Sequence, residues 1–139
     1  LLMIDIDDFK LVNDTHGHVT GDRVLEALGG ILAGQLWQVD IAARYGGEEF
    51  TIILPQTDII AAEKVAERIR IKVTELQVPL PEHGRLGVTV SIGVASFPQC
   101  GNTAEGLVEH ADQALYEAKR AGKNCVRECR APSVEKDRR

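Results

Sequence analysis

Acidic side chains occur in two short segments whose residue types and spacing could bind a metal ion. Asp5 and Asp7 stand two positions apart near the start of the chain, and Glu48 and Glu49 follow Gly46–Gly47. If these segments meet in the folded protein, the carboxylates repel one another unless a cation lies between them. Mg²⁺ suits such a site because it binds a few carboxylates and leaves positions for phosphate oxygens. The pattern therefore indicates magnesium-dependent chemistry on a phosphorylated ligand, with Mn²⁺ as the alternative metal.

The same residues also have an ordinary structural explanation. Acidic residues at strand ends are commonly just solvated, and Gly46–Gly47 would then be a tight turn that leaves the glutamates exposed. From spacing alone the turn is the simpler interpretation. Both explanations stay open at this point.

Two stretches of sequence must position these acids. Residues 2–7 alternate, which predicts a strand that buries one apolar face and directs Asp5 and Asp7 from the other. The apolar runs 41–45 and 50–54 flank the glycine pair, which predicts a hairpin whose tip carries the glutamates and whose glycines adopt positive φ angles.

Helical spacing of apolar residues recurs in three other parts of the chain. The predicted helices run from just after Asp22 to about Leu36, over 58–78, and from about Leu107 to Ala118. Asn102 is the expected N-cap of the third helix, which should stop near Gly122. Alternation over 86–95 predicts a strand, and a short strand is expected over 124–127.

This order of elements predicts an α/β fold of the α+β kind, with a mostly antiparallel sheet backed by helices on one face. The chain has 139 residues, of which 44% are hydrophobic, enough for one buried core. We assign residues 1–130 to a single domain. The polar segment 131–139, which contains Pro132, is expected to be a loose tail.

Charge and cysteine content exclude several classes of partner. A formal charge of -5 makes a nucleic-acid duplex a poor partner, because phosphate backbones select basic surfaces. The three cysteines are an odd number without zinc-like spacing, so we expect neither a disulfide framework nor a metal knuckle. A reducing cytoplasm is the simplest compartment for such a chain.

The N-terminal residues carry no targeting signal that we can identify. Their apolar run is far too short to span a bilayer and lacks the basic start of a secretion signal. The sequence begins within a strand, which suggests a piece of a longer parent with a sensor or other domains. The piece itself is expected to contact no membrane, even where the parent is anchored in one.

Three separated motifs resemble the hallmarks of one protein family. Arg44–Phe50 reads R-Y-G-G-E-E-F, which resembles the signature of GGDEF domains, the bacterial diguanylate cyclases, in its GGEEF form. Asp5–Asp22 and Ala114–Asn124 (A-L-Y-E-A-K-R-A-G-K-N) resemble the second and third hallmarks. The resemblance covers nearly the whole chain. It implies a ferredoxin-like or palm-like fold that binds GTP and joins two GTP molecules into cyclic di-GMP.

The resemblance also implies roles for the acidic residues. Asp5, the backbone carbonyl of Ile6, and Glu48 match the Mg²⁺ ligands of the family. Glu48 also matches the residue that accepts the proton of the attacking 3′-hydroxyl, and Glu49 is a second candidate for metal or proton work. The metal would bridge the triphosphate and withdraw charge from the leaving pyrophosphate.

Further residues match substrate contacts of the family. Asn13 and Asp22 match the pair that reads guanine, and a carboxylate suits this role because it accepts from guanine N1–H and N2–H₂, which adenine lacks. His18 matches a frequent substrate contact, and packing within its own turn is an equally good explanation. The residues that match phosphate contacts are Lys10, Lys119 and Lys123.

The chain departs from the family pattern in two places. Where many members carry an R-x-x-D product-binding motif, this sequence has Trp37 to Asp40, and tryptophan cannot supply arginine's bidentate grip. We therefore expect feedback inhibition through this motif to be absent or weak, and Trp37 to pack in the core or in an interface. Arg68 is a further candidate contact there, with a plain surface role preferred. The upstream D-x-L-T-G-L-x-N-R-like stretch of the family is also missing.

The prediction is a cyclase half-site that works as a homodimer. Each protomer would bind one GTP with Mg²⁺, and each 3′-hydroxyl would attack the α-phosphate held by the partner, so that proximity is the main catalytic device. One alternative is a catalytically inactive GGDEF module that binds GTP for sensing or protein interaction, against which the intact Asp5, Glu48 and Glu49 argue. Another is a cyclase of different base specificity, against which Asp22 argues.

Overall fold

The structure is a computed structural model that describes residues 1–130. A five-stranded sheet forms its centre, in the order β2-β3-β1-β6-β7. The strands are β1 (Leu2–Ile6), β2 (Ile41–Arg44), β3 (Glu49–Ile53), β6 (Val90–Val94) and β7 (Val126–Glu128). All neighbouring pairs of this sheet are antiparallel except β6 and β7, so the predicted mostly antiparallel sheet is confirmed.

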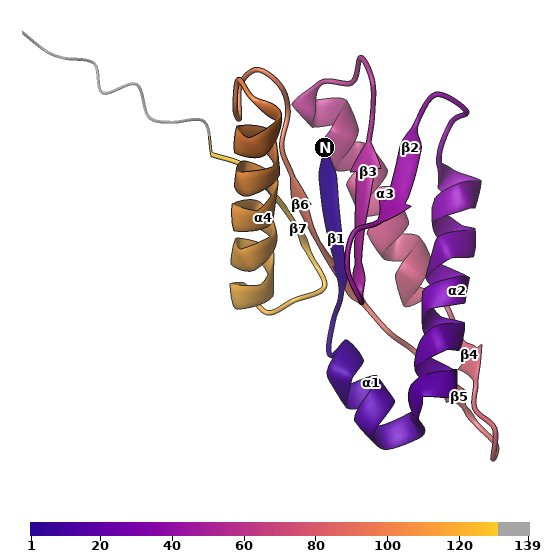
Figure 1. The fold of residues 1–139 in the computed structure, drawn as a ribbon. Helices are drawn as coiled ribbons and strands as arrows, with labels where there is room; N and C mark the ends of the chain where they lie inside the picture. The colour runs from indigo at the N-terminus through magenta and orange to yellow at the C-terminus, as the bar shows by residue number, and fades with distance from the viewer. Residues whose placement is uncertain (131–139) are drawn as a thin grey trace, which may run out of the picture.

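Helices cover both faces of the sheet, as Figure 1 shows with α4 on one side and α2 and α3 on the other. The helices are α1 (Phe9–His16), α2 (His18–Gln35), α3 (Ile59–Thr74) and α4 (Ala104–Arg120). The even-numbered residues of β1 belong to the larger core, whereas Met3 packs in a second core with Ala111 and Leu115 of α4. The prediction that helices back only one face was therefore wrong. Because both faces are covered, β1 is buried along its whole length.

The approach of α4 to the sheet depends on Gly93 in β6. A Cβ atom added to Gly93 would lie far inside van der Waals contact with the backbone of Ala111 and Leu115. Small residues on the facing side of α4, among them Ala114 and Ala118, are buried at this contact. The close approach brings the C-terminal end of α4 beside the end of β1.

Several predicted boundaries need correction. Residues 9–16 form the helix α1, which was not predicted, and α2 begins at His18 rather than after Asp22. The stretch 86–95 is divided, because Arg85–Leu86 forms β5 and pairs with β4 (Val78–Pro79) in a separate two-stranded sheet. The helix α3 ends at Thr74, earlier than predicted.

Two predictions about local geometry were also wrong. The N-cap of α4 is Thr103 rather than Asn102, and its hydroxyl oxygen accepts a hydrogen bond from the Gly106 amide at 3.0 Å. The glycines with positive φ are Gly17, Gly84, Gly101 and Gly122, so Gly46 and Gly47 do not provide the hairpin with left-handed residues. The hairpin itself is confirmed, with Arg44 of β2 opposite Phe50 of β3.

Cys100 and Cys129 form a disulfide, with their Cα atoms 6.1 Å apart. The odd number of cysteines did not suggest a disulfide framework, and two of the three cysteines form the single pair seen here. Cys100 is buried beyond the end of β6, and the amide of Cys129 donates to the carbonyl of Val94 at 2.7 Å, so strand pairing brings the two cysteines together. Cys125 is the free cysteine among the described residues.

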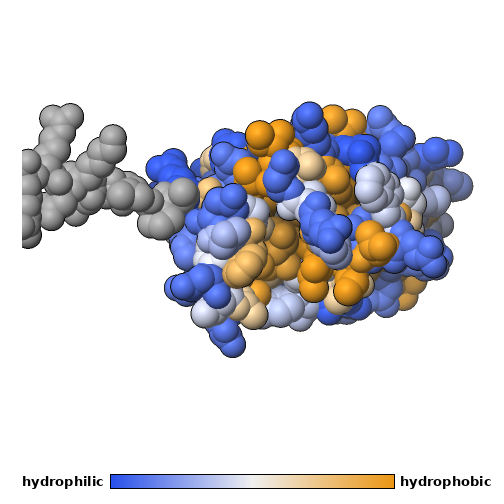
Figure 2. All heavy atoms as spheres, turned by 90° about the horizontal axis from the view of Figure 1, so that it is seen from above, coloured by the Kyte–Doolittle hydropathy of each residue, from blue (hydrophilic) through white to orange (hydrophobic). Residues whose placement is uncertain are grey.

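The end of the sheet where β1 begins carries an apolar surface (Figure 2). A cavity of about 510 Å³ opens there, and Ile53 and Phe97 on its rim are 47% and 66% exposed. None of the helices in the described part of the chain combines the length and the apolar character that a membrane span requires. The segment 131–139, predicted as a tail, lies outside the described residues, and the domain boundary at 130 stays a prediction.

Two glycine substitutions test the close contact between α4 and β6. Gly93→Ala should lower the free energy of unfolding by about 3 kcal/mol or more, because backbone atoms of α4 cannot move aside as a flexible side chain can. Gly30→Ala is the matched control: this exposed position in α2 has nothing within 4 Å of an added Cβ, and alanine should stabilise the helix by about 0.5 to 1 kcal/mol. Urea unfolding measures both, and equal effects would contradict the assigned contact.

Candidate active site

The acidic end of β1 meets the tip of the β2–β3 hairpin. Asp5 lies opposite Glu49 in the antiparallel pairing of β1 and β3. The amide of Ile6 donates to the carbonyl of Glu48 at 3.3 Å, which extends this pairing. The spatial requirement set by the sequence, that the two acidic segments lie side by side, is therefore met.

This arrangement disfavours negative charge on the hairpin acids. Burial raises the pKa of Glu48 above its usual value, and the nearby carboxylate of Asp5 raises it further. Burial, Asp5 and then Asp112 of α4 act in the same direction on the pKa of Glu49. Both glutamates therefore gain from a positive charge that is brought close to them.

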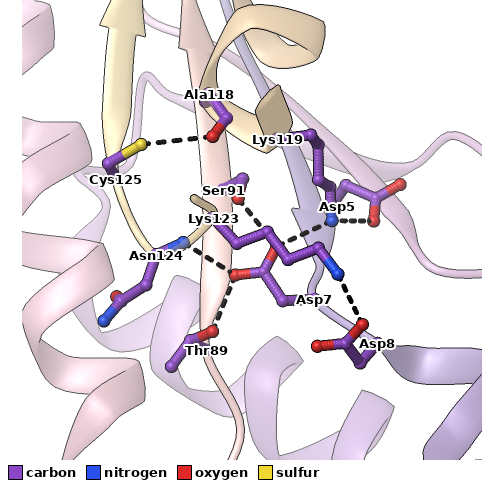
Figure 3. A network of polar contacts seen from close by, with 10 residues as sticks. All are labelled: Asp5, Asp7, Asp8, Thr89, Ser91, Ala118, Lys119, Lys123, Asn124 and Cys125. Atoms are coloured by element: carbon purple, nitrogen blue, oxygen red, sulfur yellow. Dashed lines mark hydrogen bonds and ion pairs between the residues drawn. The ribbon is translucent and has the colours of Figure 1, made fainter. Parts of the chain in front are cut away.

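Lys119, in the last turn of α4, supplies one positive charge at this cluster. Its Nζ lies 2.8 Å from Asp5 Oδ1 and 2.7 Å from Asp7 Oδ1, as Figure 3 shows. Burial acts to lower the pKa of Lys119, but the hydrogen bonds and charges of Asp5 and Asp7 outweigh it and raise this pKa above its ordinary value. Lys119 is therefore charged and tied to both carboxylates.

Asp5, in β1, and Asp7, just beyond its end, both contact Lys119 but differ in surroundings. The Asp7 side chain is 3% exposed and accepts hydrogen bonds from Thr89, Ser91 and the amide of Asn124 in addition to Lys119. Burial alone would raise the pKa of Asp7, but these donors lower it below its usual value. Asp7 is thus an anchored, ionised carboxylate, whereas Asp5 stands at the rim of the acidic cluster.

The donor set at the rim fits a hard divalent cation. Asp5 and Glu48 offer carboxylate oxygens beside the backbone of Ile6, whose carbonyl is the third predicted ligand. Within residues 1–130, no three His, Cys, Asp or Glu side chains are arranged so that they alone could hold a metal ion. A set of two carboxylates and a carbonyl leaves coordination positions for phosphate oxygens, as Mg²⁺ sites commonly do.

The predicted guanine pair lies on two helices that touch. Asn13 is half-buried on α1 and Asp22 is exposed on α2. Gly21 makes this contact possible, because a Cβ added there would overlap the Asn13 carboxamide oxygen and lie 3.3 Å from the ring of Phe9. Sequence reasoning missed the role of Gly21, although a glycine inside a helix and next to a predicted site residue is a usable signal.

The remaining predicted substrate residues lie at the surface. Lys10 is exposed on α1, and His18 is exposed at the first position of α2. Lys123 lies just after α4, and its Nζ is 2.6 Å from Asp8 Oδ1. Lys119 and Lys123 thus both reach the residues that follow Asp5, whereas no hydrogen bond or ion pair within 1–130 joins Lys10 or His18 to them.

Trp37 does not pack in the core. Its side chain is 78% exposed, and its backbone amide donates to Asp40 Oδ2 at 2.8 Å. Arg68 donates to the side-chain oxygen of Gln35 at 2.9 Å. Trp37, Asp40 and Arg68 line a cavity of about 400 Å³, so the stretch that differs from the R-x-x-D motif does lie next to Arg68.

Comparison with known proteins gives consistent matches over most of the chain. The family described as "Diguanylate cyclase, GGDEF domain" matches residues 1–125. Diguanylate cyclase A of Treponema denticola is 48% identical over 126 residues, which are 91% of this chain and 34% of that protein. The response regulator PleD of Caulobacter vibrioides is 46% identical over 127 residues, 90% of this chain and 28% of PleD. The chain therefore spans about a third of the length of these relatives.

Solved structures agree with these matches. The GGDEF domain of DgcB from Caulobacter crescentus, in complex with c-di-GMP, superposes with a TM-score of 0.85 at 36% identity, covering 91% of this chain and 75% of that one. The active GGEEF domain of a diguanylate cyclase from Vibrio cholerae gives a TM-score of 0.84 at 36% identity, covering 93% and 81%.

Neutralising Glu49 should stabilise the protein in the absence of ligand. Because the folded-state pKa of Glu49 is raised, the folded protein binds more protons than the unfolded chain between pH 4.5 and that raised value, and stability falls as the pH rises through this window. Glu49→Gln should therefore gain about 0.5 kcal/mol at about pH 7, a gain that disappears below about pH 4.

Urea unfolding at both pH values measures this effect. Glu82→Gln, at an exposed glutamate of the β4–β5 loop, is the control and should change stability little at either pH. Destabilisation by Glu49→Gln at about pH 7 would contradict the conclusion that negative charge on Glu49 is unfavourable in the folded protein.

Proposed function

Because this chain belongs to the GGDEF family of diguanylate cyclases, we propose that it is a cyclase domain that condenses two GTP molecules into cyclic di-GMP and two pyrophosphates. The observation that carries the proposal is the pairing of β1 with the hairpin, which sets Asp5 opposite Glu49 and joins Ile6 to Glu48. The names of the relatives, diguanylate cyclases among them, support the same reaction.

The metal ligands in this proposal are Asp5, the carbonyl of Ile6, and Glu48. When bound there, Mg²⁺ or Mn²⁺ would offset charge on the triphosphate and on the leaving pyrophosphate. Burial first, and then the charge of Asp5, raises the pKa of Glu48 and of Glu49, and a divalent cation bound there would favour their ionised forms, which supports this assignment.

Glu48 is the proposed proton acceptor. An ionised carboxylate at the hairpin tip, beside the end of β1, can accept a proton from a hydroxyl held at this point. The 3′-hydroxyl of one GTP gives its proton to Glu48, its oxygen bonds to the α-phosphorus of the other GTP, and the bond to pyrophosphate breaks. Glu49 follows Glu48 in the sequence and lies opposite Asp5, so it adds a second carboxylate next to the proton acceptor.

The remaining predicted residues hold the nucleotide. Lys119 and Lys123, beside the end of β1, are the proposed phosphate contacts, together with Lys10. The guanine contacts are Asn13 and Asp22, on the touching helices α1 and α2. His18, at the start of α2, is a further contact of the same nucleotide.

Catalysis requires a homodimer in this proposal. One domain carries one acidic cluster, and the product contains two equivalent phosphodiester bonds, so two domains must face each other with a GTP in each. The curated relatives are about three times as long as the matched segment. Their length supports a parent protein in which sensor or other domains control how the two cyclase domains meet.

The first test is product formation. With Mg²⁺ and GTP the domain should form cyclic di-GMP, measured by chromatography, and should form no corresponding product from ATP. Glu48→Gln should lower the rate about 100-fold or more and keep the circular dichroism spectrum, because the base is lost while the hairpin stays.

Two results would change the proposal. Unreduced turnover by Glu48→Gln would refute the role of that residue. GTP that binds but is never converted, even when two domains are fused to a dimerising partner, would favour the inactive sensory module.

Asp22 is tested by comparing two ligands. Asp22→Ala should weaken GTP binding about tenfold or more and leave inorganic triphosphate unaffected, because the carboxylate accepts from the base and not from the phosphates. Glu26→Ala, one turn further along the exposed face of α2, is the matched control and should affect neither ligand. Isothermal titration calorimetry measures both, and equal losses for the two ligands would mean that Asp22 is structural.

A further inference from the structure

We propose that Asp7 is a positioning residue, which fixes Lys119 and the turn at Lys123–Asn124 in the places where they meet the phosphates of the substrate. The proposal rests on the proposed function for the identity of that substrate, GTP. In this proposal Asp7 itself touches no substrate, and it acts on the substrate through Lys119 and Lys123.

Asp7 joins segments that lie far apart in the sequence, as Figure 3 shows. Its Oδ1 accepts from Ser91 Oγ and Lys119 Nζ, both at 2.7 Å. Its Oδ2 accepts from Thr89 Oγ1 at 2.7 Å and from the backbone amide of Asn124 at 3.0 Å. Each carboxylate oxygen therefore has two donors, more than any other acid within residues 1–130 has.

The full set of hydrogen-bond donors distinguishes Asp7 from Asp5. The Asp7 side chain is 3% exposed and held from all sides, whereas Asp5 is 13% exposed and shares with Asp7 only the contact to Lys119. A cation that arrives at the rim can replace Lys119 on Asp5 without disturbing Asp7. Lys119 has three N–H donors, so the bond to Asp7 can persist while another donor turns to a phosphate.

The turn after α4 gives a second, independent reason to regard Asp7 as the residue that holds this region in place. Gly122, Lys123 and Asn124 have φ angles of 114°, 65° and 49° in succession. Left-handed conformations are unfavourable for residues other than glycine, so this turn needs support from its surroundings. The bond from the Asn124 amide to Asp7 supplies it, assisted by the guanidinium of Arg70, which donates to Asn124 Oδ1 at 2.9 Å.

The same turn sets the direction of the Lys123 side chain. Because its backbone is held next to Asp7, the Lys123 side chain runs back along the end of β1 to Asp8, where the distance from Nζ to Oδ1 is 2.6 Å. Two of the three lysines that match phosphate contacts, Lys119 and Lys123, are thus set by a single buried carboxylate. A shift of Asp7 would displace both cations together.

The test compares GTP with guanosine, which has the same base and no phosphates. Asp7→Asn should weaken GTP binding about tenfold and leave guanosine binding within about twofold, because only the phosphate contacts depend on Asp7. In a protein that already carries Lys119→Met, Asp7→Asn should lower GTP affinity by a smaller factor than in the wild type. The effect of Asp7 through Lys119 is then already absent, and only its effect through Lys123 remains. Asp14→Asn, at an exposed carboxylate of α1, is the control and should change neither ligand.

Two outcomes would overturn the proposal: equal weakening of GTP and guanosine by Asp7→Asn, or full additivity with Lys119→Met. If Asp7→Asn does not fold, Thr89→Val removes one donor to the same carboxylate and should weaken GTP about threefold, again without effect on guanosine. Unchanged GTP binding in this variant, with Asp7→Asn unfolded, would assign Asp7 to the core alone.

Hydrogen exchange separates a failure of this proposal from a failure of the proposed function. In Asp7→Asn, or in Thr89→Val, the amide of Asn124 should exchange faster while β1 and β6 keep their protection. Uniformly faster exchange would overturn the positioning role. A wild-type chain that binds no GTP would refute the proposed function, and the exchange experiment would still decide whether Asp7 holds the turn.

Discussion

The site depends on the register between β1 and β3. Because side chains alternate along a strand, a slip of one residue would turn Asp5 to the opposite face of the sheet and separate it from the hairpin acids. The two cores oppose such a slip. Leu2 and Ile4 lie in the larger core and Met3 lies in the smaller one, so a slip of one residue would carry the carboxylate of Asp5 into the larger core. The buried strand thereby holds the acids together at its end, at an electrostatic cost that Lys119 partly offsets.

The second determinant is the distance between α4 and the sheet. Gly93 allows α4 to approach closely, and this approach carries Lys119 to the end of β1. The lysine also stands in the last turn of its helix, where a cation is favoured by the helix dipole. A side chain at position 93 would push the helix away and would leave Asp7, with no cation beside it, buried.

Parts of this arrangement could be predicted from local sequence. The alternation of β1, the hairpin around Gly46–Gly47 and the long apolar stripes of α3 and α4 are strong periodic signals, and the structure has all of them. The helix α1 was missed because it has only eight residues, of which Phe9 and Val12 are buried, too few to establish a period. Boundaries failed for a similar reason, since caps such as Thr103 compete with neighbours of equal propensity.

Other parts depend on contacts between distant residues. Asp7 meets the amide of Asn124 across 117 positions, and the disulfide of Cys100 with Cys129 forms only because β7 ends beside β6. Family resemblance indicated which residues would be at the site, but not that Asp7 would be buried among donors. It also could not indicate that Trp37 would be exposed, because burial is a property of the packed molecule.

Asp5 and Asp7 have identical side chains, but their surroundings give them different roles. Both are aspartates at the end of β1, and Lys119 contacts both. Asp7 has a full set of donors, so its charge is already compensated and it can only hold other groups in place. Asp5 shares Lys119 with Asp7 and lies near Glu48 and Glu49, whose negative charges oppose its own, so a ligand that brings positive charge gains most there. Under the proposed function, an acidic site of this kind repels a bare nucleotide, so the polyphosphate would bind together with a cation.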